Sequence, residues 1–346
     1  MGTQLLAQRP QSEEPNGPSS SRRRCVRRRN DRSVSPPAHR NRSRIVEIAE
    51  DGRHLAVDRG FMTVSVEREE IGRVPLDDIG ALIVNAHGCT YSNNLVVRLA
   101  ERGAAILVCG SNHNPVAWVW PVVMHHEQRS RIESQIEATK PLAKRLWQAV
   151  VQSKIRQQGA ALAALGREGA DGFDLMARRV GSGDPDNMEA QAARRYWPLL
   201  FGEAFRRDRE ESGINAMLNY GYAVLRATTA RAVCGAGLHP AIGLNHKSED
   251  MALIDDLMEP FRPMIDLMVA RAVDAGHTGV NRETKRYLAS VASVDMQTER
   301  GRTPVFTCAE RLAQSLAQSC ASGKPVLDFP LAPLPLELPA PPDPAA

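Results

Sequence analysis

The spacing of apolar residues changes once along the chain, and this change limits the folds open to it. Between Arg44 and Trp120 they form short runs such as "RIVEIA", "FMTVSV" and "ALIVN", separated by Asp-Gly and Arg-Gly turn signals, as is typical of strands. Past Met124 they recur at three- and four-residue spacing almost to the end, as in amphipathic helices. The sequence predicts an α+β fold, with a small β-rich N-terminal domain of antiparallel strands (44–123) before a helical C-terminal domain (124–325).

The two ends of the chain differ from its body in composition. Residues 1–43 are rich in Ser, Pro and Arg and cannot bury enough apolar surface to offset the entropy of ordering, so we expect a disordered basic leader. Residues 326–346 form a proline-rich tail, expected to be extended or disordered. The leader carries ten arginines against three acidic residues, a charge of 10 − 3 = +7, which leaves 4 − 7 = −3 for the rest. Net charge therefore gives no argument that the folded body binds nucleic acid.

Two features bear on the compartment. The sequence has no apolar run of 18 or more residues, and arginines stand where a signal peptide needs an apolar stretch. We therefore expect neither a membrane span nor secretion, and we expect a cytoplasmic protein. The cysteines form no C-x-x-C pair and are predicted to be buried free thiols rather than zinc ligands or a redox site; they are Cys25, Cys89, Cys109, Cys234, Cys308 and Cys320.

Prolines and polar clusters predict where the helices of the C-terminal part begin and end. Pro141 predicts a kink within a helix, and the Gly-, Ser- and Asp-rich segment 166–187 predicts a loop. Asp184 is a candidate cap for the next helix, with Pro185 at its first position. Pro198 predicts that this helix breaks or bends.

The segment "GLNHKSEDMALIDDLMEP" concentrates acidic groups behind a histidine. Ser248 is a candidate cap for a short helix that carries Asp255, Asp256 and Glu259 within five residues. Glu259 would share a face with both aspartates, and such like-charged pairs repel by roughly 0.2–0.5 kcal/mol. A divalent cation is one way to compensate this repulsion. Taken singly, His246 is more typical of a turn or core histidine, Asp255 of a solvent-facing or capping residue, and Asp256 of a group that supports a ligand.

Three motifs in order carry a family resemblance. They are "NMEAQAARRYW", then "NAMLNYGYAVLRA" with "GLHPAIGLNH", and last "DDLMEPFRP". In wording and separation they resemble the CRISPR-associated integrase of spacer acquisition, the first-numbered Cas endonuclease, and most of all its type II branch. The resemblance extends from about Arg44 to Leu334, which includes the strand-rich start and the "HHEQR" that opens the helical part.

The resemblance implies an architecture and a function. It implies a β-rich N-terminal domain, an all-α catalytic C-terminal domain, and a homodimer that assembles with a small second Cas protein and, in type II systems, an effector nuclease. The substrates it implies are duplex DNA, namely the prespacer and the CRISPR repeat. Position by position, it places the catalytic metal ligands on Glu189, His246 and Glu259, with Asp256 as a supporting carboxylate. Ala190 stands where the family often has glycine.

The residue types fit that assignment. Two carboxylates and an imidazole suit Mg²⁺ or Mn²⁺ and leave positions open for water and phosphate oxygens. Such an ion supports an in-line displacement in which a DNA 3′-hydroxyl is the nucleophile. We expect contacts to DNA phosphates from the polar side chains near these motifs, namely Arg194, Arg195, Tyr220 and Arg262.

Other interpretations of the same residues stay open. The acidic cluster could be structural in a DNA-binding scaffold without catalysis, which is the main alternative. A metallohydrolase for small molecules is disfavoured because no Gly-rich phosphate loop accompanies the site. The pair His125 and His126 with Glu127 lacks the H-E-x-x-H spacing of zinc hydrolases, and we expect it to lie at a domain junction or to contact DNA.

Overall fold

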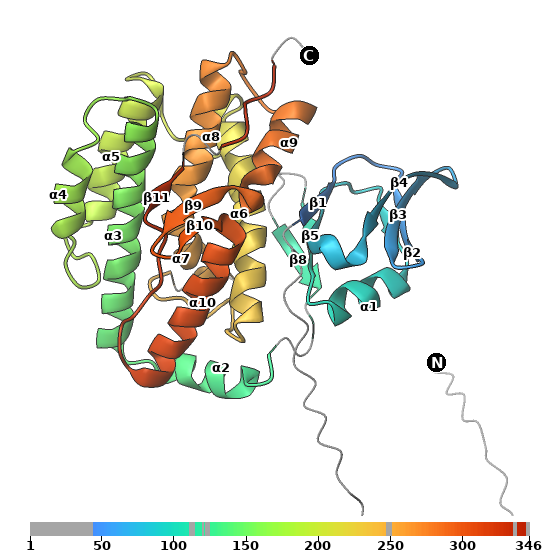
Figure 1. Cartoon of the computed structure of the whole chain (residues 1–346), viewed down its shortest axis with the longest axis horizontal. Helices are drawn as coiled ribbons and strands as arrows, with labels where there is room; N and C mark the ends of the chain where they lie inside the picture. The colour runs from blue at the N-terminus through green and yellow to red at the C-terminus, as the bar shows by residue number, and fades with distance from the viewer. Residues whose placement is uncertain are drawn as a thin grey trace, which may run out of the picture. The chain divides into compact units, whose positions relative to one another are not determined.

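The computed structural model describes residues 44–110, 115–119, 121, 125–246, 251–334 and 338–343. The expected leader, its Cys25 and the candidate cap Ser248 therefore lie outside the described residues. As the sequence predicts, a strand-rich N-terminal part precedes a part built mainly of helices (Figure 1). No helix in the described ranges is long and apolar enough to span a membrane.

The N-terminal part contains two four-stranded sheets rather than one antiparallel assembly. The first has the order β1-β5-β7-β8, in which β1, β5 and β7 are parallel and β8 is antiparallel. The second has the order β4-β3-β2-β6, antiparallel except for the β2–β6 pair. The strands are β1 (Arg44–Ile48), β2 (His54–Asp58), β3 (Phe61–Val66), β4 (Glu69–Pro75), β5 (Ile79–Val84), β6 (Thr90–Tyr91), β7 (Ala105–Cys109) and β8 (Pro115–Val119).

One helix connects β5 to β7 and so allows these two strands to pair in parallel. Helix α1 (Asn93–Glu101) begins where the Ser92 side chain accepts a hydrogen bond from the Leu95 N–H, as the capping pattern predicts. Parallel neighbours need a long connection, and α1 lies in the connection from β5 to β7. Leu95 and Leu99 of α1 are fully buried in the core of this part.

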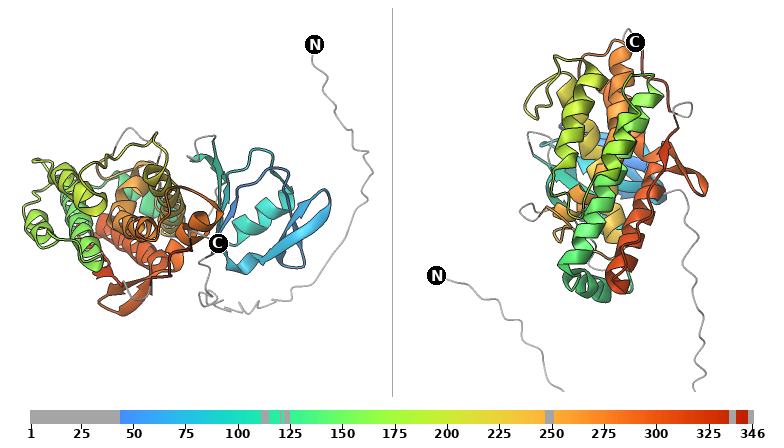
Figure 2. Two further views of the ribbon diagram at one scale, coloured as in Figure 1. Left: turned by 90° about the horizontal axis from the view of Figure 1, so that it is seen from above. Right: turned by 90° about the vertical axis from the view of Figure 1, so that its left-hand side faces the viewer.

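The C-terminal part packs its helices around two apolar cores. Helices α3, α5 and α8 run beside one another (Figure 2), and α6 packs on α8 so closely that a Cβ at Gly221 would lie 2.5 Å from Ile265 Cγ2. The helices are α2 (Gln128–Ile136), α3 (Lys140–Ala164), α4 (Gly172–Arg178), α5 (Met188–Phe201), α6 (Ile214–Gly235), α7 (Ala252–Met258), α8 (Arg262–Asp274), α9 (Arg282–Ala289) and α10 (Val305–Ser322), with a 3₁₀ turn, η2 (Glu259–Phe261), between α7 and α8.

Three local predictions in this part are wrong. Pro141 lies in the first turn of α3, where its missing N–H costs nothing, so it marks a helix start and not a kink. Segment 166–187 is not all loop, because it contains α4. Helix α5 starts at Met188 rather than near Asp184 and continues through Pro198 to Phe201.

A small three-stranded sheet accompanies the helices, and one of its strands comes from the proline-rich tail. Strands β9 (Asp295–Thr298) and β10 (Gly301–Pro304) form a hairpin, and β11 (Ala332–Pro333) pairs with β9 on its other side. The Gln157 side chain of α3 donates to the Pro330 carbonyl at 3.0 Å, and Leu338 is buried. The described portion of the tail is thus extended, and it packs on the body.

The prediction of buried free thiols holds in part for the described cysteines, because Cys89 and Cys320 are only partly buried. Five cysteines are free, of which Cys109, Cys234 and Cys308 are buried. Burial, with a smaller effect of Glu47, raises the pKa of Cys109 to about 11, so this thiol stays protonated and unreactive at neutral pH.

Polar contacts join the N-terminal part to α6 and α9. The Tyr220 hydroxyl donates a short hydrogen bond to Glu47 of β1, and Lys285 of α9 lies 3.8 Å from the same carboxylate. The Asn85 amide, which follows β5, also donates to Glu47. Glu47 is therefore the acceptor on which three elements converge.

Candidate metal centre

Glu189 is held at the N-terminal end of α5 by a set of caps. The Asn187 side chain accepts a hydrogen bond from the Ala190 N–H, and the two oxygens of Asp184 accept from the N–H groups of Met188 at 2.8 Å and Glu189 at 3.0 Å. Asp184 thus caps the helix as predicted, although it lies outside it. These bonds fix the direction of the first turn of α5 and with it the Glu189 carboxylate.

The three acidic residues of α7 and η2 each have a separate partner. Asp255, expected at the surface, is instead buried and accepts from the Arg226 guanidinium at 2.6 Å. Asp256 is fully buried against the loop that carries His246. Glu259 lies 3.0 Å from Arg262 Nε and is also paired with Lys154. The repulsion that the spacing implies is therefore compensated by side-chain cations at Asp255 and Glu259 and by hydrogen bonds at Asp256.

Lys154 of α3 joins two of the predicted metal ligands. Its Nζ lies 2.6 Å from Glu189 Oε1 and 2.5 Å from Glu259 Oε2. Burial alone would lower the pKa of Lys154, but Glu259 and Glu189 outweigh burial and raise it. Burial would likewise raise the pKa of Glu259, but Arg262, Lys154 and, to a lesser extent, His246 lower it. Lys154 and Glu259 are consequently both charged at neutral pH, and the Lys154 ammonium lies between two carboxylates.

Asp256 orients His246. Asp256 Oδ1 lies 2.6 Å from His246 Nδ1, and Oδ2 accepts from the backbone N–H groups of Leu244 at 2.6 Å and Asn245 at 3.1 Å. This loop can approach so closely because residue 243 is glycine: a Cβ there would lie 2.4 Å from the His246 carbonyl oxygen and 2.9 Å from Asp256 Oδ2. A carboxylate that accepts at Nδ1 favours the tautomer with the proton on Nδ1, and in this tautomer Nε2 carries the lone pair that a metal ion requires.

The donor set fits a hard divalent cation. The Glu189 and Glu259 carboxylates come from helices 70 positions apart in the sequence and already hold a cationic group, the Lys154 ammonium, between them. Together with an oriented imidazole, they offer the oxygen and nitrogen ligands that Mg²⁺ and Mn²⁺ take.

A second group of potential ligands lies at the start of the helical part. Among the described residues, His125, His126 and Glu127 are the three whose ligand atoms lie within 4.8 Å of one another, so Glu189, His246 and Glu259 are more widely spaced than this. The two imidazole rings stack at 4.5 Å between centroids, and the His125 ring accepts from the Glu127 N–H at 3.1 Å. His125 Nδ1 is therefore already occupied by a hydrogen bond within this group of three residues.

The side chains expected to contact DNA differ in exposure. Arg194 and Arg195 are exposed on α5, and the Arg195 guanidinium lies over the Phe173 ring and donates to the Gly169 carbonyl. Tyr220 is only 6% exposed and its hydroxyl donates to Glu47, an arrangement that disfavours a contact to DNA. Arg262 is largely enclosed and belongs to the carboxylate network.

Behind Arg262 lies a buried polar group that the sequence analysis missed. Arg262 lies over the Tyr222 ring, 4.9 Å from its centroid, and the Tyr222 hydroxyl donates to Asp266 of α8. Burial raises the pKa of Asp266 to about 7, against the hydrogen bond from Tyr222 and the charge of Arg262. The sequence indicates this buried polar group only weakly, because Asp266 is a single acidic residue among apolar residues of α8.

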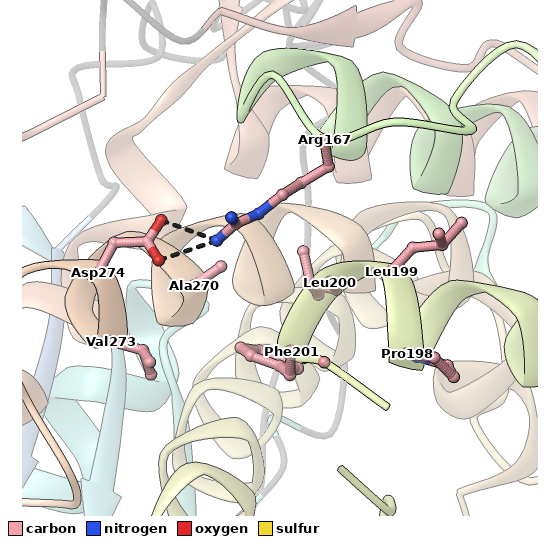
Figure 3. A pocket seen from close by; sticks show the side chains of 9 residues that line it. Arg167, Pro198, Leu199, Leu200, Phe201, Ala270, Val273 and Asp274 are labelled. Atoms are coloured by element: carbon pink, nitrogen blue, oxygen red, sulfur yellow. Dashed lines mark hydrogen bonds and ion pairs between the residues drawn. The ribbon is translucent and has the colours of Figure 1, made fainter. Parts of the chain in front are cut away.

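A cavity of about 340 Å³ lies elsewhere (Figure 3). It is enclosed by the C-terminal end of α5 and by Ala270, Val273 and Asp274 of α8. Arg167 bridges its edge by donating to both Asp274 oxygens, at 2.9 and 3.2 Å. The predicted metal ligands are not among its lining residues, so this cavity is separate from the carboxylate network.

The comparisons with known proteins fit this architecture. The model of the family "CRISPR associated protein Cas1" matches residues 46–290. The chain belongs to the Cas1 family. It is 33% identical over 273 residues to the CRISPR-associated endonuclease Cas1 of Neisseria meningitidis serogroup C, a match that covers 78% of this chain and 89% of that protein.

Solved structures share the fold with this Cas1 family member. A casposase bound to its integration product has a TM-score of 0.69 at 19% identity, over 83% of this chain and 93% of that one. A Cas6–RT–Cas1–Cas2 complex has a TM-score of 0.67 at 16% identity, over 85% of this chain and 37% of that one. The family and the fold class predicted from the motifs are thus confirmed.

Proposed function

We propose that this protein is a divalent-metal-dependent DNA endonuclease and integrase of CRISPR adaptation. The observation that carries the proposal is the convergence of Glu189 and Glu259 on one cationic position, beside a histidine whose Nδ1 is held by Asp256. Its relative from Neisseria is named an endonuclease, and the casposase with the same fold was solved with an integration product.

In this proposal Glu189, His246 and Glu259 hold Mg²⁺ or Mn²⁺. The ion, when bound, would polarise the scissile phosphate and stabilise charge on the leaving oxygen while a DNA 3′-hydroxyl attacks in line. The chain's own residues prepare the ligands. Asp256 keeps the proton of His246 on Nδ1, and Arg262 holds Glu259 in place through the oxygen at 3.0 Å. A protein nucleophile is not required.

Partners follow from the same proposal. Duplex DNA would serve both as the prespacer and as the CRISPR repeat, and the exposed Arg194 and Arg195 of α5 are candidates for phosphate contacts. The complex that includes Cas1 and Cas2 supports assembly of this chain with a small second Cas protein. A homodimer and, given the type II wording of the motifs, an effector nuclease complete the proposed set.

Strand transfer tests the proposal. A labelled duplex with free 3′-hydroxyls is incubated with a plasmid that carries the cognate repeat, the protein and its small Cas partner, in Mn²⁺, Mg²⁺ or EDTA. We expect product with either metal, none with EDTA, and none from Glu189→Ala in any condition. DNA binding without product from the wild-type protein, while a known integrase works in parallel, would instead favour the non-catalytic scaffold.

A further inference from the structure

Lys154 has a position that the proposed chemistry does not explain. Its side chain is only 14% exposed, and it lies in α3 at the helical spacing of Trp147, Val150 and Val151, all of which are buried in an apolar core. A lysine on an apolar helix face is costly unless it is paired. Its ammonium is paired twice, with Glu189 and with Glu259.

We infer that Lys154 is an internal cation that fills the place between Glu189 and Glu259 in the metal-free protein and must be displaced when the divalent ion binds. This inference rests on the proposed function, because it takes these two glutamates as ligands. It gives Lys154 two roles. Lys154 sets how tightly the metal is held, and it keeps α5 and η2, which carry the two glutamates, in place before the metal binds.

The distances support competition for the same atoms. Because Nζ lies 2.6 Å from Glu189 Oε1 and 2.5 Å from Glu259 Oε2, these oxygens are at most 5.1 Å apart, the sum of the two distances. An octahedral Mg²⁺ takes oxygen ligands at about 2.0–2.1 Å, so one ion could bridge these oxygens after only a small movement. It would then stand where the ammonium stands now.

The charges also favour displacement. Glu189 and Glu259 are balanced by Lys154 and Arg262. A divalent ion added to these four groups would leave two surplus positive charges in a buried site, where like charges repel strongly. Arg262 contacts the Glu259 oxygen that Lys154 does not, so Glu259 keeps one partner after the ammonium leaves.

Titration with Mn²⁺, followed by electron paramagnetic resonance of the free ion, tests the inference. The proteins are wild type, Lys154→Met, the exposed-surface control Lys140→Met from the same helix, and His246→Ala as a ligand variant. Melting temperature with and without Mn²⁺ gives a readout independent of activity. We expect Lys154→Met to bind Mn²⁺ about tenfold more tightly than wild type, because removing one partner leaves buried carboxylates without compensation.

The same variant should melt lower than wild type without metal and gain more from Mn²⁺, while Lys140→Met stays unchanged. Equal or weaker Mn²⁺ binding by Lys154→Met would overturn the inference, and if His246→Ala still loses binding, the proposed metal site survives. Failure of both the wild type and Lys154→Met to bind Mn²⁺ would overturn the inference and the proposed metal site together.

A second measurement applies if Lys154→Met does not fold. In the wild type, acylation of Lys154 by an amine reagent is mapped by mass spectrometry with and without Mn²⁺. We expect the metal to speed modification, because the displaced ammonium loses its two carboxylate partners. An unchanged or slower reaction would contradict displacement.

Discussion

The substitution Asp256→Asn changes the tautomer of His246 with little change in volume. The carboxylate it removes is fully buried and holds four polar contacts: His246 Nδ1 at 2.6 Å and the N–H groups of Leu244 at 2.6 Å, Asn245 at 3.1 Å and, most weakly, His246 at 3.5 Å. An amide has one acceptor oxygen and one NH₂ donor. If the NH₂ faced the two backbone N–H groups, the lost bonds would cost about 1–3 kcal/mol. The amide oxygen therefore stays toward the backbone, and the NH₂ faces His246.

That orientation reverses the roles of the imidazole nitrogens. Nδ1 becomes the acceptor and Nε2 carries the proton, so Nε2 can no longer bind a metal without losing that proton. Changes to such supporting partners typically cost about 10–100-fold in metal affinity. We expect this loss in a Mn²⁺ titration of Asp256→Asn, and a strand-transfer rate that recovers in part at high Mn²⁺ concentration.

The neighbouring Asp255→Asn is the matched control. Asp255 is buried as well but pairs with Arg226, so its loss should reduce stability and leave Mn²⁺ affinity within about twofold of wild type. The reasoning is refuted if Asp256→Asn binds Mn²⁺ as tightly as wild type, or if both variants lose the same affinity.

Three further predictions concern groups around the centre. The pKa of Asp266 is raised from 3.8 to about 7, so the folded state binds a proton that the unfolded state releases between these pH values. The free energy of unfolding should therefore fall as pH rises from about 4 to 7, by up to about 4 kcal/mol. Denaturant unfolding of Asp266→Asn should lack this decrease, and the same pH dependence in the variant and the wild type would contradict the prediction. Tyr220→Phe should lower the free energy of unfolding by about 1–2 kcal/mol without changing duplex affinity, and a loss of affinity alone would restore Tyr220 as a DNA contact. Arg194→Ala should reduce the salt dependence of duplex binding, measured by fluorescence anisotropy, by about one phosphate contact, and an unchanged slope would remove Arg194 from the interface.

Parts of the candidate site could be expected from the motifs and from neighbours in the chain. The family resemblance implied Glu189, His246 and Glu259 as metal ligands, which stay predictions, with Asp256 in support; the structure places Asp256 against His246. The capping role of Asp184 could likewise be predicted, because a cap acts within one turn of its helix.

Long-range pairings could not be predicted in this way. Asp255 was expected at the surface because nothing local reveals Arg226, which lies 29 positions earlier on α6. The parallel pairing of β5 with β7 depends on how α1 crosses over, and that of β1 with β5 depends on the strands β2 to β4 between them; short apolar runs specify neither. Lys154 did carry a signal, since it follows Trp147, Val150 and Val151 at helical spacing on a buried face, but its meaning depends on two carboxylates from other helices.

Locating a bound ion would show whether Glu189, His246 and Glu259 are metal ligands. Crystals soaked in Mn²⁺ and measured at the manganese absorption edge would give an anomalous peak wherever the ion binds. The account predicts a peak within about 2.5 Å of oxygens of Glu189 and Glu259 and of His246 Nε2, with the Lys154 ammonium moved away. A peak at His125, His126 and Glu127 with none at the glutamates would contradict it.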